Sequence, residues 1–241
     1  DIAKLKRDYQ HDPVVHTVGE DTPDVSAAHH RFWETLKEDR ATVTARIVEA
    51  VWPAVVFCRT RHGADRLAKQ LNKVGVDAAP IHGGRSQSQR TRALASFSQG
   101  NVQALIATDV AARGIHVDGV ACVLHFDPPE DHKAYVHRSG RTARAGKTGV
   151  VVSLVQPDQK NDIRTIQRQI GLNEPLTEPE PHTLRSLSER PASTRVRVAA
   201  NADSGGDSGA GRPKARNGGG GSKPGGNGSR SRTRRPNQHS S

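Results

Sequence analysis

Between residues 53 and 172, short apolar runs alternate with amphipathic stretches of helical length. Continuous apolar runs rich in β-branched residues predict strands that are covered on both faces. These runs are AVVFC (54–58), VDAAPI (76–81), VQALIAT (102–108), VACVLHF (120–126) and GVVVSLV (149–155). Strands separated by helices indicate an α/β fold built on a parallel, doubly wound sheet with right-handed crossovers.

The stretches between these runs carry signals for helix starts and buried faces. Thr60 is expected to cap one helix and Ser86 to cap the helix at 87–98, because a hydroxyl oxygen can accept the first free backbone N–H groups. The apolar spacing predicts the inward-facing residues, and these are Ala64, Leu67, Ala68 and Leu71 in the first helix and Leu94 and Phe97 in the second. Gly75 is placed to end the first helix, and residues 161–170 are predicted to form a closing helix.

The pattern is weaker before residue 53. Residues 1–24 combine a charged helical stretch, the isolated run VVHTV and a Thr-Pro linker signal, so we interpret them as the end of a preceding domain plus a linker. Residues 29–35 are expected to form an edge strand and residues 39–50 a helix. The chain starts at Asp1 and has no methionine, which suggests a piece of a longer protein.

The pattern fails after Leu172. Residues 173–241 are rich first in Pro and Ser and then in Gly and Arg, so they cannot bury enough apolar surface and are predicted to be a disordered tail. From Arg185 onward, 12 Lys and Arg face 3 Asp and Glu, which accounts for +9 of the formal net charge of +11. The tail could be only a solubilising arm, but such segments attract phosphates and we favour RNA binding.

The cysteines and the hydropathy of the chain argue against a disulfide-bonded protein, a cysteine metal site and a membrane-spanning protein. Cys58 and Cys122 lie in apolar runs, which favours buried free thiols over a disulfide and suits a reducing cytoplasmic compartment. Neither has the neighbours of a metal site, so no metal ligands are predicted. No run approaches the ~18 apolar residues that a membrane span needs, so no membrane partner is expected.

Polar clusters follow the predicted strands at their carboxyl ends. Ligands of parallel α/β sheets gather at that edge. The clusters are CRT (58–60), HGGRSQSQR (82–90), ATDVAARG (107–114) and FDPPE (126–130), with HRSGRTARAG (137–146) one helix later. Five clusters on one edge predict a ligand site there.

The last cluster spaces three arginines, Arg138, Arg141 and Arg144, three residues apart. If residues 135–141 are helical, His137 and Arg141 share a face, and Gly140 and Gly146 let the next turn bring Arg144 to the same side. A guanidinium fork matches phosphate oxygens, so this group is a candidate phosphate-binding surface. Taken alone, the spacing could equally be a solvated basic helix end.

The runs VVFCRT, IHGGRSQSQR, ATDVAARGI and YVHRSGRTARAG resemble motifs four to six of the DEAD-box RNA helicases, in the same order. The resemblance covers residues 25–172 and implies the second of the two RecA-like domains of that family. The phosphate loop GxxxxGK[ST] and the Asp-Glu-Ala-Asp box are not in this sequence. They belong to the first domain, which is therefore expected to bind most of the ATP and its Mg²⁺.

The resemblance implies roles for matching residues. Arg141 and Arg144 would be arginine fingers that reach the γ-phosphate of ATP, and His137 and Arg138 would couple the cleft to the first domain. Residues implied to hold RNA are Arg59, Gly83, Arg85, Thr108, Arg113 and Gly114. Residues implied on the nucleotide side, besides the two fingers, are Gly114, His116 and Asp118.

Four positions depart from the family pattern. His116 stands where an aspartate usually contacts the ribose, and Asp118 could partly replace it because it lies two residues further along an extended segment. Gly84, Ser139 and Ala143 replace a usual aspartate, isoleucine and glycine.

Plainer interpretations remain open for several residues. Asp109 could be only a helix N-cap, and Gly83 and Gly84 only turn glycines.

For the whole chain, the leading expectation is the C-terminal half of an ATP-dependent RNA helicase that locally opens short duplexes and is inactive without its first domain. The alternatives are an RNA-binding or RNA-chaperone module that uses no ATP, and a DNA helicase of the same superfamily.

Overall fold

The structure is a computed structural model, and it describes residues 25–112, 117–144, 147–187 and 197–198. The run VVHTV and the linker signal in residues 1–24 lie outside the described residues. So do Arg113, Gly114 and His116, and most of the predicted tail.

Seven strands form one sheet in which every pair of neighbours is parallel. Their order across the sheet is β3 (Ala78–Ile81), β4 (Ala104–Ala107), β2 (Ala54–Phe57), β6 (Cys122–His125), β7 (Gly149–Val155), β1 (Ala28–Glu34) and β8 (Leu176–Thr177). Every residue of β2, β4, β6 and β7 is buried, as expected for continuous apolar runs. The predicted parallel α/β sheet is confirmed.

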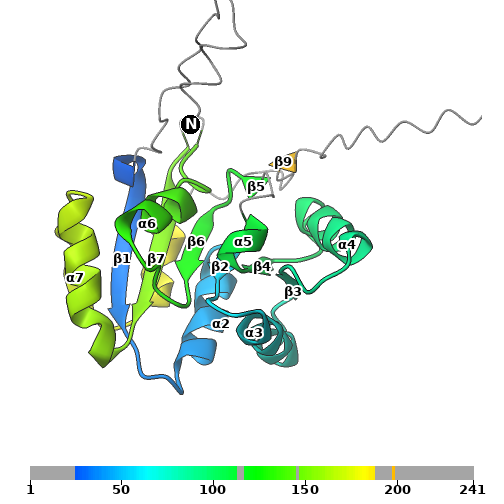
Figure 1. The fold of residues 1–241 in the computed structure, drawn as a ribbon, viewed down its shortest axis with the longest axis horizontal. Helices are drawn as coiled ribbons and strands as arrows, with labels where there is room; N and C mark the ends of the chain where they lie inside the picture. The colour runs from blue at the N-terminus through cyan, green and yellow to red at the C-terminus, as the bar shows by residue number, and fades with distance from the viewer. Residues whose placement is uncertain (1–24, 113–116, 145–146, 188–196, 199–241) are drawn as a thin grey trace, which may run out of the picture. The chain divides into compact units, whose positions relative to one another are not determined.

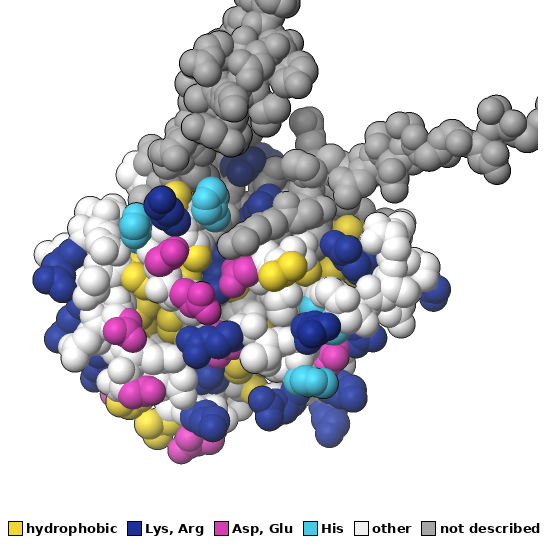
Figure 2. Space-filling model, in the orientation of Figure 1, with side chains coloured by type: hydrophobic (Ala, Val, Ile, Leu, Met, Phe, Trp, Pro, Cys, Tyr) yellow, Lys and Arg dark blue, Asp and Glu magenta, His cyan; other side chains and the backbone are white. Residues whose placement is uncertain are grey.

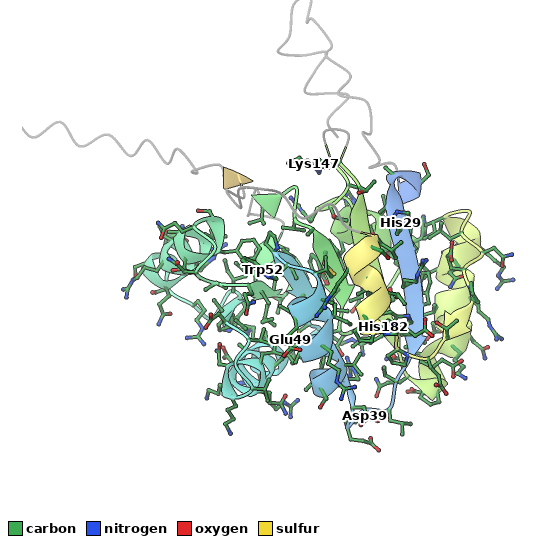
Figure 3. The ribbon with its side chains drawn as sticks, turned by 180° about the vertical axis from the view of Figure 1, so that it is seen from behind. His29, Asp39, Glu49, Trp52, Lys147 and His182 are labelled. Carbon is green, nitrogen blue, oxygen red and sulfur yellow. The ribbon has the colours of Figure 1, made fainter. Side chains whose placement is uncertain are left out.

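Helices cover both faces of the sheet, so it is doubly wound. They are α2 (Arg40–Ala50), α3 (Arg61–Lys73), α4 (Gln87–Ser98), α5 (Asp109–Ala112), α6 (His132–Ser139) and α7 (Lys160–Gln169). One hydrophobic cluster packs α2 and α3 against the sheet, and a second contains Phe97 of α4, Tyr135 of α6 and Ile163 of α7. Figure 1 shows α6 in front of the strands and α7 beside β1. Figure 3, seen from behind, shows α2 in front of the strands.

The predicted helix caps are present. The Thr60 Oγ1 accepts the Gly63 N–H at 3.0 Å. The Ser86 hydroxyl accepts the Gln89 N–H at 3.3 Å while the Gln89 side chain accepts the Ser86 N–H at 3.1 Å, which completes a capping box. The predicted inward stripe of α3 is buried, and in α4 Phe97 is buried while Leu94 is partly buried.

The ordered elements continue beyond Leu172, where the tail was predicted to begin. β8 forms the edge of the sheet beside β1, and β1 pairs with β7 along its whole length. The strand expected at residues 29–35 is therefore present as β1, but the prediction that it lies at an edge was wrong. A 3₁₀ helix, η3 (Pro181–Ser186), then packs on α2, and its Leu184 is completely buried. Figure 3 shows η3, marked by His182, beside α2. Residues 173–187 hold only three leucines among prolines and polar residues, too few for a periodic pattern, so the sequence did not predict this contact.

Two short strands, β5 (Val117–Asp118) and β9 (Arg197–Val198), pair antiparallel outside the main sheet. Both cysteines are free and buried as predicted, and burial raises the pKa of each thiol to about 12. No helix in the described ranges is both long and apolar enough to cross a membrane.

Candidate functional site

The carboxyl ends of the central strands surround a cavity of about 540 Å³. We call it the strand-end cavity. It brings together residues from the ends of β2 and β4, from α5, from the loop after β6 and from α6. The lining residues are Phe57, Arg59, Thr108, Asp109, Val110, Ala112, Glu130, Asp131, Lys133, Ala134, His137, Arg138 and Arg141. The side of the molecule seen in Figure 2 carries acidic and basic side chains interspersed over its middle.

The predicted site residues divide into two groups. Five line the strand-end cavity, namely Arg59, Thr108, His137, Arg138 and Arg141. Gly83, Arg85 and Arg144 are described but do not line it. The backbone of Asp118 lies in β5, whereas its side chain is outside the described residues.

His137 and Arg141 line the same cavity, but they do not share a helix face as predicted. Asp131 caps α6 by accepting the Ala134 N–H at 2.7 Å, and the helix ends at Ser139. Arg141 therefore lies in the turn beyond the helix, but it still lines the same cavity as His137. The Arg141 carbonyl accepts the Gly119 N–H at 2.9 Å, which fixes its backbone to the segment before β6.

The turn after Arg141 places Arg144 apart from the cavity. The Arg144 Nε donates to the Gly140 carbonyl at 2.5 Å, and the Thr142 Oγ1 donates to the Val120 carbonyl at 2.5 Å. Between them, Ala143 has φ of 52°, a left-handed conformation that favours glycine. This is the position where the family usually has glycine.

Arg138 is buried and fully engaged inside this domain. Its exposed fraction is 4%. Its Nε and Nη2 donate to the two oxygens of Asp109 at 2.7 Å each, and its Nη1 donates to the Asp127 carbonyl at 2.8 Å. The guanidinium also lies 5.0 Å from the centre of the Phe57 ring. Asp109 is thus the first residue of α5 and the ion-pair partner of Arg138, a long-range role that its local sequence did not reveal.

Arg40 and Asp127 form a second buried ion pair that sequence reasoning missed. The Arg40 Nη2 donates to the Asp127 Oδ1 at 2.6 Å and also to the Phe126 carbonyl. The Arg40 guanidinium lies 3.8 Å from the centre of the Phe126 ring. The Asp127 Oδ2 accepts the backbone N–H of Arg59 at 2.8 Å. The only sequence signal was the position of Asp127 at a strand end.

The loop after β3 forms its own polar cluster around Asp65 of α3. The His82 Nε2 donates to the Asp65 Oδ1 at 3.0 Å, its Nδ1 accepts the Gly84 N–H at 3.2 Å, and the Arg85 Nη2 donates to the same Asp65 oxygen at 2.5 Å. Burial alone would raise the pKa of the Asp65 carboxyl, but hydrogen bonds from His82 and Arg85 outweigh it and lower that pKa below its usual range.

Gly84 lies close to the His82 ring. A Cβ at Gly84 would be 3.2 Å from the His82 Nδ1, so any side chain here would press on the imidazole. The aspartate that the family usually carries at this position would have to shift this ring.

Comparison with known proteins gives a consistent result. Residues 41–146 match the family model described as the helicase conserved C-terminal domain. The chain is 40% identical over 146 residues to the DEAD-box ATP-dependent RNA helicase CshA of Bacillus subtilis. The matched region covers 60% of this chain but only 30% of the Bacillus protein.

Solved structures agree. The Escherichia coli DEAD-box protein SrmB, solved bound to regulator of ribonuclease activity A, is 30% identical with a TM-score of 0.59, covering 69% of this chain and 98% of the SrmB chain. A DEAD box protein from Methanococcus jannaschii is 30% identical with a TM-score of 0.59, covering 74% of this chain and 48% of that chain.

Proposed function

The chain belongs to the DEAD-box helicase family, of which it carries the helicase C-terminal, RecA-like domain, and on that basis we propose that it is the second motor domain of an ATP-dependent RNA helicase. In this proposal it supplies Arg141 to the ATP phosphates and part of the surface that holds RNA. The protein would open short RNA duplexes locally. The observation that carries the proposal is that Arg141 and His137 line the same cavity as Arg59 and Thr108.

Arg141 suits a phosphate-stabilising role. A guanidinium is always charged, and a pre-placed charge stabilises the negative charge that spreads over the oxygens of a transferring phosphoryl group. Its backbone is held by the Gly119 hydrogen bond, so the side chain starts from a fixed point beside the cavity. Arg144 is the weaker candidate for a second finger, because its Nε bonds the Gly140 carbonyl and it does not line the cavity.

His137 and Arg138 have different roles in the proposed function. His137 lines the cavity from α6 and can meet a group on a facing domain. Arg138 is buried and committed to Asp109 and Asp127, so its part in the proposed mechanism is to position α6.

The RNA surface in this proposal has two parts. Arg59 and Thr108 lie at the cavity, and Arg85 lies with Gly83 in the loop after β3. Backbone contacts of this kind hold single strands with little sequence preference. Arg113 and Gly114 extend the same surface by their match to the family motif.

The residues around the cavity suit phosphate oxygens better than a magnesium ion. Magnesium prefers carboxylate oxygens and water. Of the three lining carboxylates, Asp109 is paired with Arg138 and Asp131 caps α6, and Glu130 alone offers too few oxygens to hold the ion. We therefore assign Mg²⁺ and the phosphate loop to the first domain, where the metal would neutralise charge on the ATP phosphates.

The test is hydrolysis and unwinding by the full-length protein that contains this chain. We expect ATP hydrolysis that RNA stimulates, and ATP-dependent separation of a short RNA duplex. The isolated chain should bind single-stranded RNA without hydrolysing ATP. RNA binding with no RNA-stimulated hydrolysis by the full-length protein would support a plain RNA-binding module, and stimulation by single-stranded DNA alone would support a DNA helicase.

A further inference from the structure

Asp127 joins three segments that are far apart in the sequence. Its Oδ1 accepts from Arg40 at the start of α2, at 2.6 Å. Its Oδ2 accepts the backbone N–H of Arg59 after β2, at 2.8 Å. Its backbone carbonyl accepts from Arg138 of α6, at 2.8 Å. Each of the three oxygens of Asp127 therefore accepts a hydrogen bond from a different segment of the chain.

The contacts on Asp127 continue toward both halves of the strand-end cavity. Through the Arg59 backbone they reach the segment that we assign to RNA. Through Arg138 they reach Asp109 at the end of β4 and the helix that carries His137. Asp127 itself does not line the cavity, so any effect it has on ligands acts through these neighbours.

Arg40 holds Asp127 in this arrangement. Its exposed fraction is 6%, and its guanidinium stacks on Phe126 while donating to the Phe126 carbonyl and to Asp127. A buried guanidinium requires a charged partner, and the planar fork allows two bonds in fixed directions. Arg40 consequently fixes the Asp127 carboxylate through Oδ1, and Oδ2 is left to accept the Arg59 N–H.

We propose that Asp127, fixed by Arg40, is a positioning residue that sets the Arg59 segment and α6 relative to each other, so that RNA and nucleotide meet correctly spaced groups. This inference rests on the proposed function for what binds on each side. The geometric part does not depend on it: Asp127 meets the Arg59 segment with its carboxylate and α6 with its backbone carbonyl.

The substitution Asp127→Asn tests this role. It weakens the side-chain bonds that hold Asp127 in place, so the backbone carbonyl that accepts from Arg138 is held less firmly as well. Asparagine has nearly the same shape but only one side-chain acceptor oxygen, with an amide donor in place of the second. Arg40 and the Arg59 N–H can no longer both be satisfied. Arg40→Lys is the milder companion, because lysine keeps the charge but loses the fork.

Glu34→Gln provides a matched control. It removes another carboxylate at the carboxyl edge of the same sheet, one that pairs with Lys160 at 2.7 Å but makes no contact with the strand-end cavity.

The first readout is hydrogen–deuterium exchange of this chain. Asp127→Asn should speed the exchange of backbone amides both at residues 58–60 and in α6, under conditions where the variant remains folded. Glu34→Gln should leave both segments unchanged. Faster exchange at only one segment, or at neither, would overturn the positioning role whether or not the protein is a helicase.

The second readout is steady-state ATP hydrolysis by the full-length protein. Asp127→Asn should raise both the KM for ATP and the RNA concentration for half-maximal rate about tenfold, the scale of one charge-assisted hydrogen bond. Arg40→Lys should raise both by less, and Glu34→Gln should change neither more than about twofold. A change in only one constant, or an equal change in the control, would contradict the inference. An unaltered protein without RNA-stimulated hydrolysis would instead contradict the proposed function.

Discussion

Individual arginines have two different roles at the carboxyl edge of the sheet. Arg40 and Arg138 are buried and bonded to carboxylates within the domain. Arg59 and Arg141 face the strand-end cavity, where a ligand can reach them. Because a buried guanidinium needs a partner carboxylate, the first pair fixes the shape of the site. The second pair can supply charge to a bound phosphate.

Ala143 gives a prediction at the residue scale. Its left-handed φ of 52° costs an L-residue with a Cβ about 1–2 kcal/mol, whereas glycine adopts it readily. Glycine also loses more chain entropy on folding, so Ala143→Gly should raise the free energy of unfolding by about 1 kcal/mol or slightly less. Urea unfolding of this chain measures the change. Ala95→Gly inside α4 should have the opposite sign, and a loss of stability in Ala143→Gly would contradict the assigned conformation.

At the scale of elements, the contact between β6 and β7 buries a histidine. His125 is completely buried, and its Nδ1 lies 2.9 Å from the Ser153 Oγ. Burial, with smaller contributions from Arg138 and His30, lowers the pKa of His125 well below the ordinary 6.5. The folded protein therefore keeps this imidazole neutral, whereas the unfolded chain protonates it below its ordinary pKa.

The free energy of unfolding of the domain should consequently decrease at acidic pH. Above pH ~6.5 both states hold a neutral His125 and its titration has no effect. Below that pH the unfolded state binds the extra proton, so stability falls by up to about 1.4 kcal/mol per pH unit. Urea unfolding between pH 7 and pH 5 should show this loss, and His125→Asn should have a shallower pH dependence. Equal slopes in the two proteins would contradict a depressed His125 pKa.

The contact of η3 with α2 gives a second prediction for an element. Leu184 is completely buried, so Leu184→Ala should lower the free energy of unfolding by about 2–5 kcal/mol. Leu36 is 53% exposed and serves as the control, for which Leu36→Ala should change stability by less than about 0.5 kcal/mol. Unchanged stability in Leu184→Ala would mean that the domain ends near Leu172, as the sequence pattern suggested.

Local patterns predicted the elements well, and long-range contacts account for what they missed. The longer strands of the sheet, the caps at Thr60 and Ser86 and the placing of polar clusters at one edge of the sheet all follow from signals within a few residues. The pairing of Arg138 with Asp109 joins residues 29 positions apart, and that of Arg40 with Asp127 joins residues 87 apart. Such pairs have no local signature. The burial of Leu184 has no local signature either, because it depends on the packing of η3 against α2.

At the scale of the whole molecule, the net positive charge is concentrated in the C-terminal residues of the sequence. Residues 188–241 hold 11 of the chain's 36 Lys and Arg and only 3 of its 25 Asp and Glu. A neutral domain followed by a cationic segment is suited to weak, general attraction to RNA phosphates.

Removing residues 199–241 tests that attraction, because it keeps β9 and deletes 8 Lys and Arg but only 2 Asp and Glu. RNA binding should weaken alike for all sequences, and the slope of log affinity against log salt should become shallower by about 0.7 for each RNA phosphate that the segment neutralises. The melting temperature of the folded part should stay the same. A salt dependence that truncation leaves unchanged would show that the segment does not contact RNA.

The central claim, that this domain completes the ATPase of a longer helicase, is tested most directly at Arg141. We expect Arg141→Ala in the full-length protein to lower RNA-stimulated ATP turnover by about 10³–10⁵-fold, the range for arginine fingers, with RNA binding in the absence of nucleotide nearly unchanged. Arg164→Ala, which removes an arginine of α7 that does not line the strand-end cavity, should leave turnover within about twofold. An Arg141→Ala enzyme that kept half of its turnover would contradict the account.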